Sequence, residues 1–178
     1  MKYWFTADTH FGHKNIIKYC NRPFATLDAM DNTIIRNWNA RVDPDDTVFV
    51  LGDFCFRNSP GGKLGEGTQN KASFYSDKLN GTKIFLCGNH DKNNSVKSLI
   101  RSMTIRHGGY DIYLIHNPED YKPNELNFCG HVHDKWKFKA LKDKTIIVNV
   151  GVDVWKFMPV TINEIIEKLA AWKKWQKP

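Results

Sequence analysis

Polar blocks that repeatedly follow short apolar runs constrain this chain more than any other feature of its sequence. Four such runs have the length of a strand: residues 3–5, 48–51, 84–87 and 112–115. Apolar runs of this length, bounded by polar residues, are typical of buried β-strands. The chain therefore places a series of polar side chains where buried strands give way to loops.

Seven of these polar side chains are of types that bind metal ions. They are Asp8, His10, Asp53, Asn89, His116, His131 and His133. Carboxylate, imidazole and carboxamide groups suit borderline divalent metals. A carboxylate has two oxygens, whereas a neutral imidazole offers one acceptor nitrogen, so a bridging Asp53 would let the seven groups hold two ions. Two ions about 3.5–4 Å apart are a known device for hydrolysing phosphate esters.

The polar blocks resemble the motifs of the calcineurin-like metallophosphoesterases. That family's motifs run D-x-H, G-D, G-N-H-[DE], H and G-H-x-H. Here they stand as Asp8-Thr9-His10, Gly52-Asp53, Gly88-Asn89-His90-Asp91, His116, and Gly130-His131-Val132-His133. Any single block is weak evidence, but the ordered set over residues 8–133 is specific. The resemblance implies an α/β (α+β) fold, a sandwich of two mixed β-sheets flanked by helices, with a dinuclear site at the carboxyl ends of the strands.

The resemblance also implies a role for each matched residue. It divides the ligands between two ions bridged by Asp53, with Asp8, His10 and His133 on one ion and Asn89, His116 and His131 on the other. It makes a metal-bound hydroxide the nucleophile and places His90 beside the scissile phosphate as the general acid. An imidazole with a pKa near about 6.5 suits proton donation around neutral pH. Asp91 holds either the His90 ring or the local turn.

Other residues near these blocks have two interpretations each. His13 either touches the substrate phosphate or is a polar loop residue. Arg57 either pairs with a phosphate oxygen or is solvated. Asn89 is a candidate for substrate binding as well as for metal binding. Residues 149–153 either return to the site as outer-shell support or form a turn stabilised by Asp153.

Length and composition fit one domain spanning residues 1–178. The formal charge of +7 points to a polyanionic partner, such as a nucleotide or nucleic acid, or else to a mildly basic surface without a binding role. No apolar stretch approaches the roughly 20 residues that cross a bilayer, so no membrane is expected. The four cysteines lack C-x-x-C spacing, and the first residues run straight into a motif. These features favour reduced thiols and a cytoplasmic location.

The expected function is that of a metal-dependent phosphoesterase, with a phosphodiester of a nucleotide or nucleic acid as the substrate. The alternatives are a phosphomonoesterase and a non-catalytic scaffold that retains the fold. Mixed nitrogen and oxygen ligands accept manganese, iron, zinc, cobalt or nickel, of which manganese is favoured here. The oligomeric state is left open.

Periodicity predicts the remaining elements. Helices are expected over residues 14–19, from a cap at Asp28 to Trp38, over 73–79, over 95–102, and from Thr161 onward, where Thr161 and Glu164 form a capping box. Further strands are expected over residues 103–106, 110–115, 126–129, 136–140 and 145–150. The glycine-rich residues 57–70 predict a mobile loop.

Overall fold

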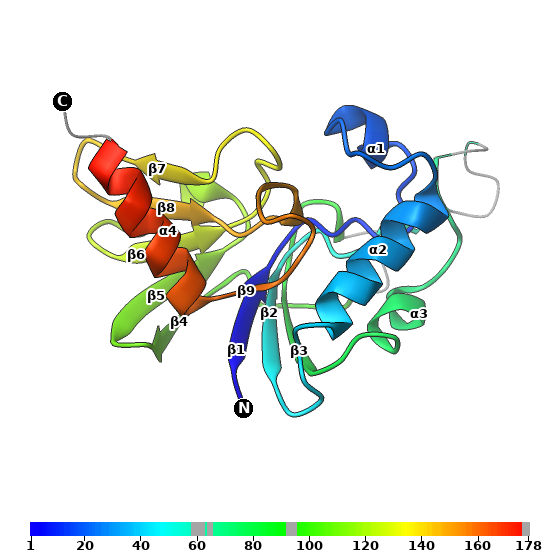
Figure 1. Ribbon diagram of the computed structural model, residues 1–178, viewed down its shortest axis with the longest axis horizontal. Helices are drawn as coiled ribbons and strands as arrows, with labels where there is room; N and C mark the ends of the chain where they lie inside the picture. Colours follow the sequence, from blue (N-terminus) through cyan, green and yellow to red (C-terminus); the bar gives the residue numbers. More distant parts are fainter. Residues whose placement is uncertain (58–62, 64–65, 92–95, 176–178) are drawn as a thin grey trace.

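The computed structural model describes residues 1–57, 63, 66–91 and 96–175. Its strands form two sheets (Figure 1). The first has the order β3-β2-β1-β9, in which the strands are Thr82–Leu86, Thr47–Leu51, Tyr3–Thr6 and Val160–Thr161. The second has the order β4-β5-β6-β8-β7, in which the strands are Ser102–His107, Tyr110–Ile115, Leu126–Cys129, Ile146–Asn149 and Phe138–Ala140. Both sheets mix parallel and antiparallel pairs, which confirms the predicted two-sheet architecture.

Alternation along β2 explains why the first sheet is buried on both faces. Phe49 and Leu51 lie in the core cluster that also contains Leu114 and Phe128 of the second sheet. Val48 points the other way, into a cluster built with residues of the helices. Successive side chains of a strand point to opposite faces, so one apolar run supplies both layers.

Four α-helices flank the sheets in the described part of the chain. They are α1 (Ile16–Tyr19), α2 (Leu27–Asn39), α3 (Ala72–Ser76) and α4 (Ile162–Trp175). In Figure 1, α1, α2 and α3 lie on the side of β1, β2 and β3, and α4 lies beside the second sheet. Within the described residues, no helix is long and apolar enough to pass through a bilayer.

The helix starts show one correct and one wrong prediction. Thr161 and Glu164 form the predicted capping box, since the Glu164 carboxylate accepts the Thr161 N–H at 2.9 Å and Thr161 Oγ1 accepts the Glu164 N–H at 3.4 Å. The prediction that Asp28 caps α2 is wrong. Thr26 occupies that position in extended geometry, and its hydroxyl accepts the Ala29 N–H at 3.1 Å. Asp28 lies instead in the first turn, where its charge still favours the helix dipole.

The predicted helix over residues 95–102 is also wrong within the described residues. Residues 96–100 are not helical, Leu99 is 96% exposed, and β4 already begins at Ser102. The spacing of Val96, Leu99 and Ile100 imitates a helix period. Backbone pairing prevails instead, because Ile100 O accepts the Cys87 N–H at 2.7 Å and the Ser98 hydroxyl donates to Phe85 O. The segment thus covers part of the edge of the first sheet.

Smaller differences concern where elements begin and end. The first helix starts at Ile16, α3 stops at Ser76, and β7 begins at Phe138. The prediction of a mobile loop over residues 57–70 rests largely on residues 58–62 and 64–65, which lie outside the described residues. In the described part of that loop, Gly67 forms an antiparallel β-bridge with His13, and Thr68 donates its N–H to Gly12 O at 2.9 Å.

The carboxyl ends of strands from both sheets converge on one region. Strands β1, β2 and β3 are mutually parallel, as are β5, β6 and β8. Just beyond β1 and β8, Ala7 and Gly151 form a parallel bridge that joins the two sheets. The polar blocks that follow these strands are therefore brought together at one end of the sandwich.

Candidate metal centre

Strained backbone marks the ends of the strands that carry the candidate ligands. Five of the seven ligands have positive φ angles between 48° and 70°, namely Asp8, His10, Asp53, His131 and His133. Such a conformation costs a non-glycine residue about 1–3 kcal/mol and persists where the surrounding structure imposes it. For His131 and His133 it bends the chain after β6, so these two residues do not continue the alternation of a strand. The local backbone is therefore shaped to aim these side chains.

Two motif glycines permit the close approach of the blocks. Gly52 has a φ of 85°, and a Cβ there would collide with Nδ1 of His116. A Cβ on Gly130 would lie 2.7 Å from Oδ2 of Asp8. Glycine is required at both positions because a side chain would push a candidate ligand out of place.

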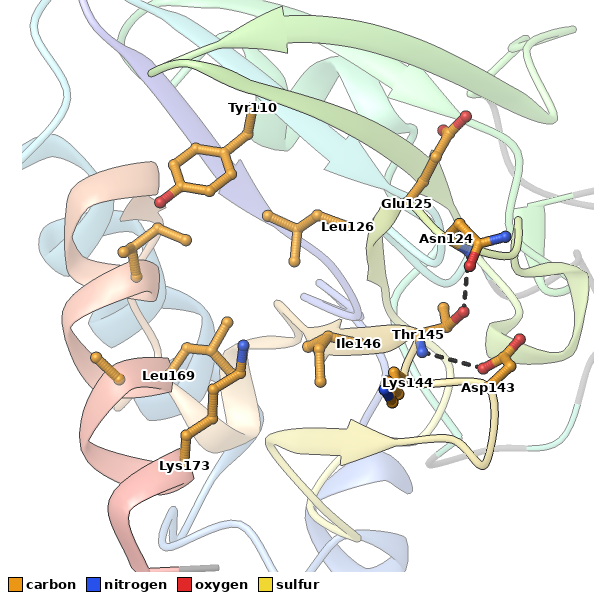
Figure 2. Close-up of a pocket in the computed structure, with 12 residues that line it drawn as sticks. Tyr110, Asn124, Glu125, Leu126, Asp143, Lys144, Thr145, Ile146, Leu169 and Lys173 are labelled. Atoms are coloured by element: carbon orange, nitrogen blue, oxygen red, sulfur yellow. Dashed lines mark hydrogen bonds between the residues drawn. The ribbon is translucent and has the colours of Figure 1, made fainter.

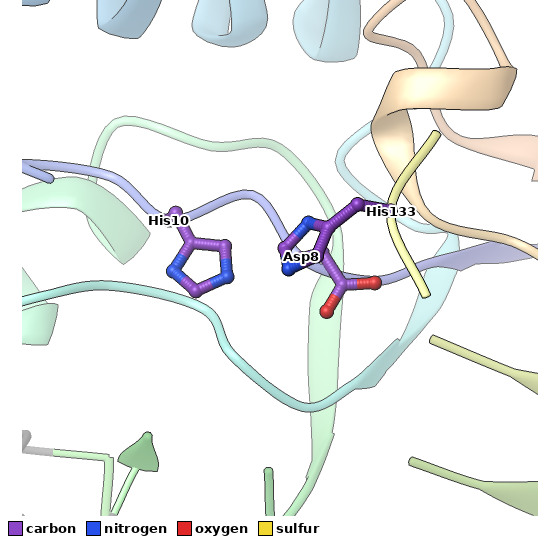
Figure 3. Close-up of side chains that lie close together, drawn as sticks. All are labelled: Asp8, His10 and His133. Carbon is purple, nitrogen blue, oxygen red and sulfur yellow. The ribbon is translucent and has the colours of Figure 1, made fainter. Parts of the chain in front are cut away.

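Asp8, His10 and His133 form the first group of candidate ligands (Figure 3). One ligand atom from each of these side chains lies within 4.8 Å of the others. Asp8 is fully buried, and its carboxylate accepts the His131 N–H at 2.9–3.0 Å. Burial raises the pKa of Asp8 to about 6 and holds the pKa of His10 well below its ordinary value. His10 is thus neutral and has a lone pair available for a metal.

The second group contains Asp8, Asp53 and His116, again with ligand atoms within 4.8 Å of one another. Asn89 Oδ1 lies 2.8 Å from His116 Nε2 and 2.9 Å from His131 Nδ1. The three residues predicted for the second ion therefore converge on one carboxamide oxygen. Asp8 belongs to both groups, so the geometry brings the ligands together without dividing them between two ions.

Asp53 lies between the two groups. Its Oδ2 is 3.6 Å from His10 Nε2 and 3.5 Å from His116 Nε2. Among the described residues, Asp53 Oδ2 and His10 Nε2 are buried atoms without a hydrogen-bond partner. Burial alone would raise the pKa of Asp53, but His116 and His10 lower it below its ordinary value, so the carboxylate is charged. Orphaned buried atoms in a set of oxygen and nitrogen donors fit a divalent cation.

His90 and Asp91 follow Asn89 and have different surroundings. His90 is exposed, its backbone N–H donates to Asp53 Oδ1 at 2.9 Å, and its ring centroid lies 5.7 Å from that of His10. Asp91 is buried, and its carboxylate accepts backbone N–H groups of Asp53 at 2.9 Å and Gly88 at 2.8 Å. Of the two sequence interpretations of Asp91, these contacts fit the support of the local turn.

His13 and Arg57 lie near the His10 side of the site. His13 is buried, its ring stacks on Phe56 at 4.6 Å, and its Nδ1 lies 3.4 Å from Nδ1 of His10. Burial lowers the pKa of His13 to about 4, so its neutral ring can accept a hydrogen bond from His10 and orient that ligand. Arg57 is half-buried and directly follows Phe56 in the chain.

Sequence reasoning missed Arg22, a buried cation behind the candidate ligands. Arg22 donates to both Asp153 oxygens at 2.8 and 2.9 Å, and also to the carbonyls of Asp8 at 2.7 Å and Thr9 at 3.0 Å. Asp153 Oδ2 in turn lies 3.5 Å from His133 Nδ1. Arg22 stands in an Asn-Arg-Pro turn that matches none of the five blocks, so only its surroundings reveal its role.

The contacts of residues 149–153 decide between the two interpretations of that stretch. Asp153 reaches His133, and the Asn149 side chain donates to the carbonyl of His133 at 2.7 Å. Both residues thus support the backbone or ring of a candidate ligand. The outer-shell interpretation is the one that fits, and the carboxylate–imidazole contact is of the kind that orients metal-binding histidines.

We expect metal binding to release protons at neutral pH. Burial alone would lower the pKa of His116 and of His133, but Asp53 raises that of His116 to about 9 and Asp153 raises that of His133 to about 10. Both rings are therefore in the charged imidazolium form at pH 7 without metal, and a bound ion must displace one proton from each. Because these protons are lost as the pH rises, the apparent affinity for metal should increase with pH, with roughly two protons released per protein at pH 7.

Calorimetric titration with Mn²⁺ in buffers of different ionisation enthalpy measures this release of protons. An affinity unchanged between pH 6 and pH 8 would contradict it.

A cavity of about 480 Å³ lies between α4 and the second sheet (Figure 2). The residues that line it include Leu126, Ile146, Leu169 and Lys173. None of the seven candidate ligands lines this cavity. The candidate metal ligands thus lie at the strand ends and not in this cavity.

Comparisons with known proteins agree with this geometry. The family model for the calcineurin-like phosphoesterases matches residues 1–177. The uncharacterized protein MJ1445 of Methanocaldococcus jannaschii is 38% identical over 175 residues, which cover 93% of this chain and 90% of that protein. The crystal structure of the protein of unknown function AQ665 from Aquifex aeolicus has a TM-score of 0.68 at 28% identity, and the match covers 94% of this chain and 98% of that one.

Proposed function

From the fact that the chain belongs to the calcineurin-like phosphoesterase family, we propose that it is a phosphodiesterase with a dinuclear metal centre. Family membership supports metal-dependent hydrolysis of a phosphoester. The proposal adds a nucleotide or nucleic acid as the substrate, manganese as the favoured metal and residues 1–178 as one functional domain. The four free cysteines are consistent with a reducing compartment such as the cytoplasm.

One observation carries the proposal. Asp53 Oδ2 lies at nearly equal distances, 3.6 and 3.5 Å, from nitrogen atoms of His10 and His116, which belong to different sides of the site. A buried, charged carboxylate oxygen with no hydrogen-bond partner among the described residues is poorly accommodated without a cation. We therefore assign Asp53 as the bridging ligand. The other ligands are Asp8, His10, Asn89, His116, His131 and His133.

Two divalent ions, when bound, supply neutralisation of the phosphate charge and a lower pKa for an attacking water. The protein supplies the remaining chemistry. His90 is exposed at the rim beside His10, where its ring can reach the oxygen that leaves from phosphorus and give it a proton. Asp91 acts as a positioning residue through the backbone of Asp53. His13 orients His10, and Arg57 is the candidate to contact a phosphate oxygen.

Hydrolysis of aryl phosphates tests the proposed function. With Mn²⁺, the purified protein should release p-nitrophenol from bis(p-nitrophenyl) phosphate faster than from p-nitrophenyl phosphate, and a chelator should abolish both activities. A preference for the monoester would favour a phosphomonoesterase. Absence of both activities, together with no bound metal by elemental analysis, would favour a scaffold that retains only the fold.

A further inference from the structure

A second, smaller cavity of about 250 Å³ adjoins the candidate metal centre. Two of the candidate ligands, Asn89 and His116, form part of its wall. Arg101 and Asp120 line the same cavity and come from segments outside the five sequence blocks. The cavity therefore shares two wall residues with the site where phosphate chemistry is proposed, and it is lined by charged groups that the proposed reaction does not use.

The backbone fixes the position of this cavity wall. Ile100 O accepts the N–H of Cys87, which itself lines the cavity, and this bond ties the residue before Arg101 to the end of β3. Asp120 ends the short 3-10 helix η2 (Pro118–Asp120), which follows His116 directly and whose Asn117 side chain accepts the Glu119 N–H at 3.1 Å. Both charged residues thus stand on segments attached to the strands that carry candidate ligands.

The cavity and the ring of the proposed general acid lie beside different candidate ligands. His90 is near His10, whereas the cavity is bounded by Asn89 and His116. A phosphodiester has two ester arms, and the arm whose oxygen receives the proton must lie at His90. The arm that stays on phosphorus then needs space elsewhere, and this cavity offers it beside the second group of ligands.

The charge of Arg101 indicates what this retained arm contains. None of the ion pairs within the described part of the chain involves Arg101. A guanidinium without a carboxylate partner, in a cavity that adjoins a proposed phosphate site, matches a second phosphate through two parallel hydrogen bonds. Asp120 in the same wall accepts hydrogen bonds, as a sugar hydroxyl would require.

We propose that this cavity is a subsite for the retained arm of a nucleoside phosphodiester, and that Arg101 binds a second phosphate carried by that arm. The inference rests on the proposed function, because it concerns the same site. It favours a polynucleotide or a nucleotide with a further phosphate over a simple phosphodiester as the substrate. Arg101 is then a specificity-determining residue.

Two chromogenic substrates with the same leaving group test this subsite. They are thymidine 5′-(p-nitrophenyl phosphate) and its 3′-phosphorylated derivative. Water attacks phosphorus, the bond to the aryl oxygen breaks, and p-nitrophenol leaves, so the thymidine is the retained arm in both. The wild-type protein should prefer the 3′-phosphorylated substrate by about tenfold in kcat/KM, as expected for one charge-assisted contact. The Arg101→Gln variant should lose this preference and keep its activity on the other substrate.

Two further variants sharpen the result. Asp120→Asn removes a carboxylate from the same wall and should increase the preference by about two- to threefold, because a like charge near the second phosphate is lost. Arg106→Gln is the matched control, since Arg106 is exposed on β4 and lies 3.9 Å from Asp111. This variant should behave as the wild type. Equal losses on both substrates in Arg101→Gln, or an unchanged preference, would overturn the proposal.

A binding measurement separates this inference from the proposed function. Calorimetry with thymidine 3′,5′-bisphosphate and thymidine 5′-monophosphate requires no turnover. The bisphosphate should bind about tenfold more tightly to the wild type and with no advantage to Arg101→Gln. If neither chromogenic substrate is hydrolysed but this difference is found, the subsite stands and the proposed activity fails. If hydrolysis occurs without a binding difference, the activity stands and the subsite fails.

Discussion

Asp53→Asn should abolish metal-dependent hydrolysis and weaken metal binding more than any other single change. Asparagine preserves the shape of the side chain but loses the charge and one of the two carboxylate oxygens, of which Oδ2 lies near both His10 and His116. Loss of an outer-shell partner costs roughly 10- to 100-fold in metal affinity, so loss of a bridging ligand should exceed that range. Calorimetric titration with Mn²⁺ and release of p-nitrophenol from an aryl diester measure the two effects.

The control for this variant is Asp111→Asn. Asp111 is an exposed carboxylate on β5, the same strand that ends at the candidate ligand His116, but it stands near the opposite end of that strand. This change should leave metal affinity and turnover unaltered. Thermal unfolding should show that both variants are folded at the assay temperature. An Asp53→Asn protein that binds two ions with the affinity of the wild type would refute the bridging role.

His90→Ala should slow the hydrolysis of phosphodiesters in a way that depends on the leaving group. General acid catalysis contributes about 10²- to 10⁴-fold, and it matters most when an alkoxide must leave. A dinucleotide should therefore lose activity within this range, whereas a p-nitrophenyl ester should lose much less because its phenolate leaves without a proton. Rates for a series of esters with leaving groups of increasing pKa give the dependence, which should be steeper in the variant.

The metal content distinguishes this role from a structural one. The His90 side chain is exposed and is assigned to neither ion, so the variant should retain the metal affinity and thermal stability of the wild type. His10→Ala is the informative comparison, because it removes a buried candidate ligand and should reduce metal binding. If His90→Ala lowered all substrates equally and also lost metal, His90 would not be the acid.

The sequence pattern predicted every strand except the short β9, and the resemblance to the phosphoesterases predicted the two-sheet fold. Four of these strands could be predicted because each contains an apolar run that ends at a polar block. Val48 to Leu51 illustrates this, since it alternates between two clusters while remaining apolar throughout. The assignment of ligands to individual ions remains a prediction, because Asp8 lies within reach of both groups.

Contacts between distant segments were beyond the reach of sequence reasoning. Arg22 has no motif around it, and its importance comes from Asp153, which is 131 positions away in the chain. The false helix over residues 95–102 has the same origin, since local spacing favoured a helix while hydrogen bonds to Phe85 and Cys87 determined the backbone. Local pattern predicts elements well and their partners poorly.

The bond between Arg22 and Asp153 has a consequence for biosynthesis. The carbonyls of Asp8 and Thr9 accept hydrogen bonds from Arg22, and Arg22 is itself held by Asp153, which follows β8. A nascent polypeptide that has been synthesised only through β3 therefore contains Asp8, His10 and Asp53 but lacks the tether that orders them. Ordered binding of metal is thus expected only after Asp153 has been synthesised and has reached Arg22.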